Sequence, residues 1–377
     1  CEGVYLREAL KEHSANFDMN EHSEQFAFRD SGLADDPEYT SASISPYNYA
    51  NRLADDSTAY YCISGWMDGG GYSTGAIQRF NWLKNPESRL LLGPWDHGAR
   101  ANVSPWRVPS IEQQQPIVGA EVLRFFDKHL RFQQSGIERE KRVRYYTMGL
   151  EEWQSSDTWP PDAKDYILYL RTSLSLIEEA PSEALGEDEY RGDYACGTGK
   201  HSRYDRLYIE NVETYYDDWD GREDRMLSYT GEPLKKSVEI TGHPWIDLKF
   251  SCSERDCTLF VYISDVTKEG KSIYVTEGVF RALHRKPGNN PINIPSTGPT
   301  HSFKKSDAKF MIPNEPTEIA FEFFPTSYVF KKGHRIRLSI ALADKDHFIH
   351  IPANEPPKVK IFRNLKMTSC ITLPMIQ

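Results

Sequence analysis

Two glycine-rich turns, each at the end of a short apolar run, constrain the fold of this chain more than any other feature. One run leads into Gly65-Trp-Met-Asp-Gly-Gly-Gly71, and a later run leads into Gly93-Pro-Trp-Asp-His-Gly98. Short apolar runs bounded by turn residues are typical of buried strands in a parallel sheet. Because ligands bind beyond the carboxyl ends of such strands, we expect Asp68 and His97 to lie at the functional edge of an α/β sheet.

The order and spacing of these two residues point to acid–base chemistry. Asp68 precedes His97 by 29 residues, which leaves room for one helix and one strand between them. An Asp followed by a His matches the triad order Ser…Asp…His of α/β serine hydrolases. The carboxylate would accept from imidazole Nδ1–H, so that Nε2 faces the attacking hydroxyl. A turn-capping Asp and a His packed under the next loop form the alternative, which the paired motifs disfavour.

The chain lacks a convincing nucleophile ahead of Asp68. Gly71-Tyr-Ser-Thr-Gly75 matches the pattern G-x-S-x-G, but a nucleophile elbow needs its first glycine directly at the end of a buried strand. Here five residues separate Gly65 from Gly71, and Ser73 precedes His97 too closely to fit the strand that would carry an acid. We therefore predict that Ser73 caps or begins a helix over 74–84. A compact esterase that uses Ser73 stays open as an alternative.

Metal chemistry is not expected at these turns. Asp96 beside His97 could suggest a metal site with Asp68 as a third ligand, but neighbouring residues on a turn point in different directions and no second His lies nearby. The acidic segment 217–224 resembles a calcium loop without its bidentate Glu, so we expect a solvated acidic loop.

Composition excludes several classes of partner. The formal net charge of −10 argues against nucleic acid, which attracts concentrated Lys and Arg. No apolar run approaches the roughly 18 residues of a membrane span. The six cysteines show no C-x-x-C spacing; Cys252 and Cys257 could bridge a hairpin, although free thiols are favoured.

The hydrophobic period changes near residue 160. Before it, the pattern predicts helical structure over 1–30, a loop-rich stretch over 31–57, strands at 59–64 and 89–93, and a helix over 117–130. After it, apolar residues alternate in short segments, with long polar loops at 173–205 and 284–306 and no strong helix. This pattern predicts an antiparallel β-sandwich, most simply a jelly roll.

The two turn motifs and several later segments resemble the cocaine-esterase-like hydrolases, which group with the Xaa-Pro dipeptidyl-peptidases of the S15 type. The later segments are Phe125–Leu130, Val143–Gly149, Leu227–Leu234 and Lys332–Leu338. The resemblance implies an α/β plus all-β chain in three parts. Residues 1–50 would end a helical cap and return to the sheet, 51–153 would form the C-terminal part of an α/β-hydrolase domain, and 154–377 would form a jelly-roll (galactose-binding-like) β-sandwich.

The resemblance also implies a function. Asp68 would be the triad acid and His97 the base, in acyl transfer to water without metal or organic cofactor. The family's nucleophile and oxyanion hole lie upstream, so we expect a longer protein or a second chain to supply the Ser, and this chain to be inactive alone. Substrates would be small esters or amides, including Xaa-Pro peptides. A non-enzymatic binding or assembly module with a vestigial hydrolase segment is the alternative.

Overall fold

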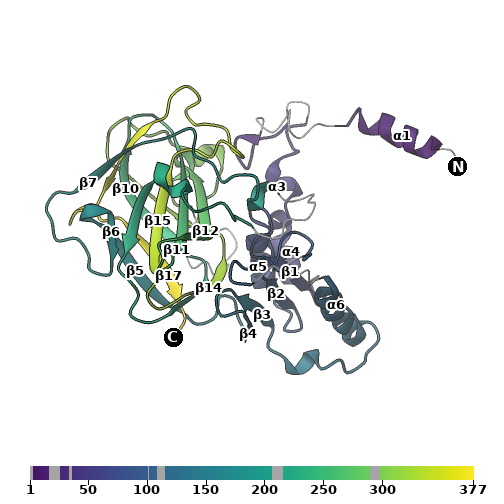
Figure 1. Cartoon of the computed structure of the whole chain (residues 1–377). Coiled ribbons are helices and arrows are strands. Elements are labelled where there is room, and N and C mark those ends of the chain that lie inside the picture. Colours follow the sequence, from purple (N-terminus) through teal and green to yellow (C-terminus); the bar gives the residue numbers. More distant parts are fainter. Residues whose placement is uncertain are drawn as a thin grey trace.

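The computed structural model describes residues 3–16, 26–33, 36–100, 102–107, 115–205, 215–288 and 298–377. Within them, a helix-containing region with a four-stranded sheet precedes a larger β-rich region, and the two lie side by side (Figure 1). The helices are α1 (Val4–His13), α3 (Ser41–Ile44), α4 (Ala50–Ala54), α5 (Tyr72–Trp82) and α6 (Gln115–His129). Short 3-10 helices are η2 (Pro46–Tyr49), η3 (Ile137–Arg139), η4 (Thr172–Leu174), η5 (Arg203–Asp205), η6 (Arg222–Arg225), η7 (Ala282–His284) and η8 (Lys305–Asp307).

The strands form two sheets. The first has the order β1-β2-β3-β4, and its strands are β1 (Tyr61–Gly65), β2 (Arg89–Gly93), β3 (Val143–Thr147) and β4 (Glu152–Ser156). The second has thirteen strands, β5 (Lys164–Arg171), β6 (Ser175–Ile177), β7 (Glu187–Arg191), β8 (Leu227–Gly231), β9 (Val238–Gly242), β10 (Trp245–Cys252), β11 (Thr258–Val266), β12 (Ser272–Arg281), β13 (Thr317–Glu322), β14 (Thr326–Phe330), β15 (Arg335–Ala341), β16 (Lys358–Phe362) and β17 (Cys370–Met375).

The predicted parallel α/β unit is confirmed. Strand β1 pairs in parallel with β2, and β2 pairs in parallel with β3, while β4 closes the sheet as an antiparallel strand. Helix α5 connects β1 to β2 and buries Ala76, Ile77 and Phe80. The apolar spacing of these three side chains gives the helix one face for packing against the sheet.

The N-terminal helix is shorter than predicted. Helix α1 covers part of 1–30, but the described residues 27–30 form bends and turns, so that part of the prediction is wrong; residues 1–2 and 17–25 lie outside the described chain. The physical reason is a tertiary contact, because the backbone N–H of Arg29 donates to the carbonyl of Phe303 at 2.9 Å. Helix α1 buries none of its side chains.

The β-rich region is antiparallel, as predicted, apart from the parallel pair β6–β8. The polar loop expected over 173–205 is partly wrong, because β6 and β7 lie within it. Strand β7 has the sequence Glu-Asp-Glu-Tyr-Arg and pairs with β16 at the end of the sheet path, with alternate side chains exposed. An edge strand of this kind needs no apolar face, so its sequence resembles a loop.

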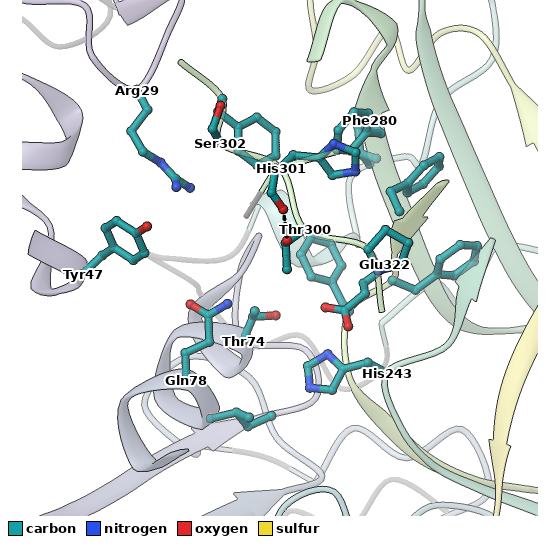
Figure 2. Close-up of a pocket in the computed structure, with 18 of the residues that line it drawn as sticks. Arg29, Tyr47, Thr74, Gln78, His243, Phe280, Thr300, His301, Ser302 and Glu322 are labelled. Carbon is teal, nitrogen blue, oxygen red and sulfur yellow. Dashed lines mark hydrogen bonds between the residues drawn. The ribbon is translucent and has the colours of Figure 1, made fainter. Parts of the chain in front are cut away.

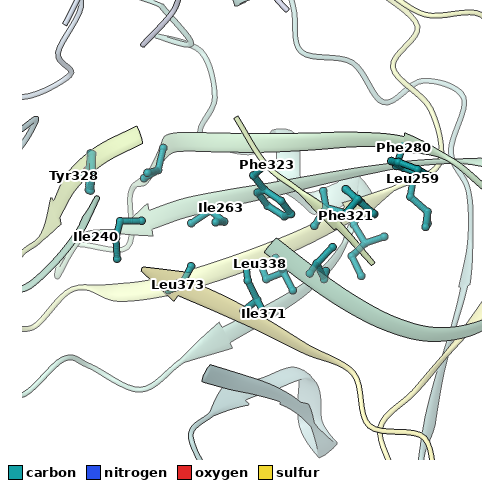
Figure 3. Close-up of a cluster of buried hydrophobic side chains, with 14 of the residues drawn as sticks. Ile240, Leu259, Ile263, Phe280, Phe321, Phe323, Tyr328, Leu338, Ile371 and Leu373 are labelled. Carbon is teal, nitrogen blue, oxygen red and sulfur yellow. The ribbon is translucent and has the colours of Figure 1, made fainter. Parts of the chain in front are cut away.

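The core of the β-rich region lies between its strands (Figure 3). Strand β11 is buried over its whole length, on both faces. One face places Leu259, Val261 and Ile263 in the main core. The other places Phe260 and Tyr262 in a second aromatic cluster, whose further members include Met67 and Val103 from the helix-containing region. Strand β11 therefore packs in the core of the β-rich region on one face and against the helix-containing region on the other.

The described residues contain no helix that is both long enough and apolar enough to cross a bilayer. Cys252 and Cys257 are both buried free thiols, which agrees with the favoured prediction for this pair.

Candidate active site

Backbone hydrogen bonds join the two glycine-rich turns at the carboxyl ends of β1 and β2. The N–H of Trp66 donates to the Gly93 carbonyl at 3.0 Å, and the N–H of Met67 donates to the Trp95 carbonyl at 3.2 Å. A Cβ at Gly65 would lie 2.1 Å from the Trp95 carbonyl oxygen, so only glycine permits this approach. The relative position of the two turns is therefore fixed by the main chain.

The turns bring Asp68 and His97 into direct contact. His97 Nδ1 lies 2.8 Å from Asp68 Oδ1. The Asp68 side chain is 11 % exposed, whereas the His97 side chain is 44 % exposed. An ionised carboxylate can only accept, so Nδ1 carries the proton and the neutral ring keeps its lone pair on Nε2. A histidine held in this tautomer at a partly open position can take a proton at Nε2 from a bound hydroxyl or water.

Sequence reasoning missed two neighbours of this pair. The Ser64 hydroxyl donates to Asp68 Oδ2 at 2.7 Å, so each carboxylate oxygen has one partner. The Tyr72 ring lies 5.4 Å from the His97 ring, centroid to centroid. The signal for Ser64 was a hydroxyl inside an otherwise apolar strand, four residues before the Asp. No pattern in the sequence indicated Tyr72, because its contact depends on the path of the His97 turn.

Ser73 lies where the sequence predicts, in the first turn of α5. It is completely buried, and its hydroxyl has no hydrogen-bond partner among the described residues. A hydroxyl that is closed off from solvent cannot present itself to a substrate carbonyl. The geometry therefore supports the structural interpretation of Ser73.

The carboxylates considered as metal ligands have other partners. Asp96 accepts from the Arg100 guanidinium at 2.8 Å and from the Arg100 backbone N–H at 3.1 Å. In the acidic segment, Asp217 pairs with His201 at 2.8 Å, and Asp220 accepts from the Ser272 backbone N–H at 2.9 Å. Over the described part of the chain, no three His, Cys, Asp or Glu side chains gather as a metal site would require.

The β-rich region supports the turn that carries Asp68. Arg203 is 1 % exposed and places Nη2 3.6 Å from the Met67 sulfur, and the Tyr204 ring lies against Gly70, 3.0 Å from where a Cβ would be. Arg203 also faces Glu277, which is fully buried, with Nε and Oε1 3.8 Å apart. Arg203 and Tyr204 therefore contact the turn at Met67 and Gly70, on either side of Asp68.

A second network holds the segment that follows His97. The indole N–H of Trp106 donates to the Tyr328 hydroxyl at 2.8 Å, and that hydroxyl donates to Asp265 Oδ2 at 3.0 Å. His334 Nδ1 lies 2.9 Å from Asp265 Oδ1. Burial raises the pKa of Asp265, although its pairing with His334 opposes the shift. This chain of hydrogen bonds ties residues 102–107 to the β-rich region.

The two tryptophans at these turns are buried. Trp66 and Trp95 are each 1 % exposed, and the Trp66 indole N–H donates to the Tyr146 carbonyl at 2.8 Å. Trp66 packs in the main hydrophobic core, and Trp95 packs in a smaller cluster with Leu91 and Ala99.

Comparison with known proteins finds relatives that are named as esterases or peptidases. Residues 135–370 match the family model of the X-Pro dipeptidyl-peptidase C-terminal non-catalytic domain. A Mycobacterium bovis protein named as a candidate serine esterase is 36 % identical over 386 aligned residues, covering 98 % of this chain and 61 % of that protein. The cocaine esterase of Rhodococcus sp. is 28 % identical, covering 77 % of this chain and 49 % of its own length.

A solved structure shows the same fold. The crystal structure of an aminopeptidase from a marine-sediment Thaumarchaeota archaeon superposes with a TM-score of 0.68 at 20 % identity, covering 87 % of this chain and 57 % of that chain. This chain therefore spans about three fifths, or less, of the lengths of these relatives. The family match over residues 135–370 and the relatives together show that the chain belongs to the cocaine-esterase-like and X-Pro dipeptidyl-peptidase (S15-type) hydrolase family.

Proposed function

We propose that this chain supplies the acid and the base of a serine hydrolase that cleaves ester or amide bonds, Xaa-Pro peptide bonds included. The observation that carries the proposal is the 2.8 Å contact between His97 Nδ1 and the buried carboxylate of Asp68. Its support comes from the position of both residues at the carboxyl ends of parallel strands and from the serine-esterase relative.

In this proposal His97 acts twice through Nε2. It takes the proton of a serine hydroxyl as that oxygen attacks the carbonyl carbon, and then gives the proton to the leaving group. Water repeats the sequence on the acyl-enzyme and releases the acid. Asp68 keeps the ring in the Nδ1–H tautomer and stabilises the imidazolium that forms at each step. No metal or organic cofactor takes part.

The proposal extends to the architecture of the whole protein. Residues 1–50 would end a helical cap, residues 51–153 would complete an α/β-hydrolase domain, and residues 154–377 would form a jelly-roll β-sandwich of the galactose-binding type. The serine and the oxyanion hole would come from an upstream hydrolase segment, in the same gene product or in a separate chain. The 377-residue chain alone would then have no turnover.

A fluorophosphonate probe, which phosphonylates an activated serine with loss of fluoride, tests the proposal. We expect no adduct on the purified chain, and an adduct on the upstream segment when both are combined. His97→Ala should abolish that labelling. The matched control is His129→Ala in α6, where the ring packs 4.4 Å from Phe125, and it should leave labelling unchanged.

Two results would contradict this assignment. An adduct on Ser73 of the isolated chain would make the compact esterase correct. Two folded, associated segments that never label would favour a non-enzymatic binding or assembly module.

A further inference from the structure

A cavity of about 610 Å³ has walls that include neither Asp68 nor His97. Its walls come from three parts of the chain: residues 29–48, helix α5, and the β-rich region (Figure 2). Its size falls in the range of small-molecule sites. Its aromatic lining comprises Tyr47, Trp159, Phe280, Phe303, Phe321, Phe323 and Phe324.

Arg29 supplies a positive charge at one side of this cavity. Its guanidinium carbon lies 5.0 Å from the centroid of the Tyr47 ring and 5.2 Å from that of Phe303. Within the described ranges Arg29 has no carboxylate partner. The acid Asp307, which also lines the cavity, pairs with Lys286 and accepts from a serine hydroxyl. The Arg29 charge is therefore held in place by two rings but not neutralised.

His243 lines the cavity as a buried, neutral ring. The ring is 8 % exposed, and its Nε2 lies 3.3 Å from the indole nitrogen of Trp159, which can only donate. Burial lowers the pKa of His243, so the ring is neutral and its proton sits on Nδ1. That Nδ1–H has no partner among the described residues. Because Nδ1 is itself closed to solvent, His243 offers no donor to a ligand and adds no charge to this wall of the cavity.

The cavity is electrically polarised. Figure 2 shows Arg29 and Glu322 on opposite sides of the central space, with Gln78 reaching in from α5 and His243 near Glu322. An anionic group is attracted at the Arg29 side and repelled at the Glu322 side. A ligand with one anionic end and an apolar body therefore has a single favourable orientation.

We propose that this cavity is a binding site for a small organic carboxylate with an aromatic or branched apolar body. The carboxylate pairs with Arg29, and the body lies among the aromatic rings. A guanidinium binds a carboxylate through charge-assisted hydrogen bonds, which give this end of the site its specificity.

The test uses the 377-residue chain and two probes of equal shape. The probes are 4-phenylbutyrate and its neutral amide, 4-phenylbutanamide, and binding is measured by calorimetry and by saturation-transfer NMR. We expect saturable binding of the acid, at least about tenfold tighter than that of the amide. Arg29→Gln should weaken binding of the acid by about tenfold and leave binding of the amide unchanged.

Two matched variants complete the design. Arg52→Gln changes an exposed arginine in α4 that does not line the cavity, and it should bind the acid as wild type does. His97→Ala should also bind the acid as wild type does, because binding in this cavity does not depend on hydrolysis. A failure of the binding proposal can therefore be distinguished from a failure of the proposed hydrolase function. Thermal melting of each variant verifies folding.

The proposal is overturned by either of two results. One is the absence of saturable binding at millimolar 4-phenylbutyrate in the folded chain. The other is equal affinity for acid and amide with no effect of Arg29→Gln.

Discussion

The Ser64 hydroxyl donates a 2.7 Å hydrogen bond to Asp68 Oδ2, the carboxylate oxygen that does not face His97. Ser64 is 4 % exposed and lies in β1, so it restrains the carboxylate from within the sheet. We expect Ser64→Ala to let the carboxylate rotate and to lower kcat about tenfold in the complete enzyme, with KM unchanged, because the substrate does not touch Ser64. Steady-state kinetics with a nitrophenyl ester measure this. A rise in KM with kcat intact would show that Ser64 belongs to the substrate site.

Asp68→Asn should lower kcat of the complete enzyme by about 10⁴, because an amide in this position no longer fixes the Nδ1–H tautomer of His97. His97→Ala should be at least as severe. The double variant should be little worse than His97→Ala, since the two side chains act as a unit. Additive losses in the three proteins would contradict the proposed division of roles.

Ser73→Ala should leave activity of the complete enzyme unchanged. The substitution removes a buried hydroxyl that has no partner among the described residues, so unfolding free energy should stay equal or rise by up to about 1 kcal/mol. Urea denaturation and ester kinetics on the same preparation supply both values. Loss of turnover in a folded variant would reinstate the compact esterase.

The Arg203–Glu277 pair offers a test of coupling between two buried charges inside the β-rich region. Both side chains are buried, and burial raises the pKa of Glu277. Removing one partner leaves the other charge buried alone, so Glu277→Gln and Arg203→Met should each destabilise the chain by about 3–5 kcal/mol. The double variant should cost clearly less than the sum of the two single variants. Additive effects in a denaturation cycle would show that the two charges do not interact.

The buried carboxyl group of Asp265 should make the free energy of unfolding depend on pH. Its pKa is raised in the folded chain, so between about pH 4 and that raised value the folded state binds more protons than the unfolded state. The free energy of unfolding should therefore fall as pH rises through this window, relative to Asp265→Asn, which cannot titrate. Urea denaturation across the window measures the difference.

Tyr328→Phe is the companion variant, because it removes the hydroxyl that donates to Asp265 but keeps the carboxyl group. That hydrogen bond lowers the pKa of Asp265, so its loss should widen the window in which stability falls. If the free energy of unfolding of wild type and of Asp265→Asn changed with pH in parallel, Asp265 would not be the group responsible for the pH dependence.

The local elements of the parallel unit could be predicted from sequence because their signals are local. An apolar run, a glycine turn and an amphipathic stretch are enough to locate β1, α5 and β2 within a few residues. The meeting of Asp68 and His97 followed from the same pattern, since parallel strands end at one edge.

The remaining features depend on contacts between distant segments. Strand β7 is polar because it lies at the end of the sheet path, and Arg203 reaches Met67 across the boundary between the two regions. Neither property has a period in the sequence. The cavity beside Arg29 was equally hidden, because its walls come from three separate stretches of chain.

The double burial of β11 has a consequence for evolution. Residues at alternate positions of this strand pack against different neighbours. Val261 packs in the core of the β-rich region, and Phe260 packs in the cluster that contains Met67. A substitution that shifts the backbone of β11 to improve packing on one face changes the packing on the other face. On the Phe260 face this change reaches Met67, the residue before Asp68. The sequence of the β-rich region should therefore be constrained during evolution by the position of the Asp68 turn as well as by its own core.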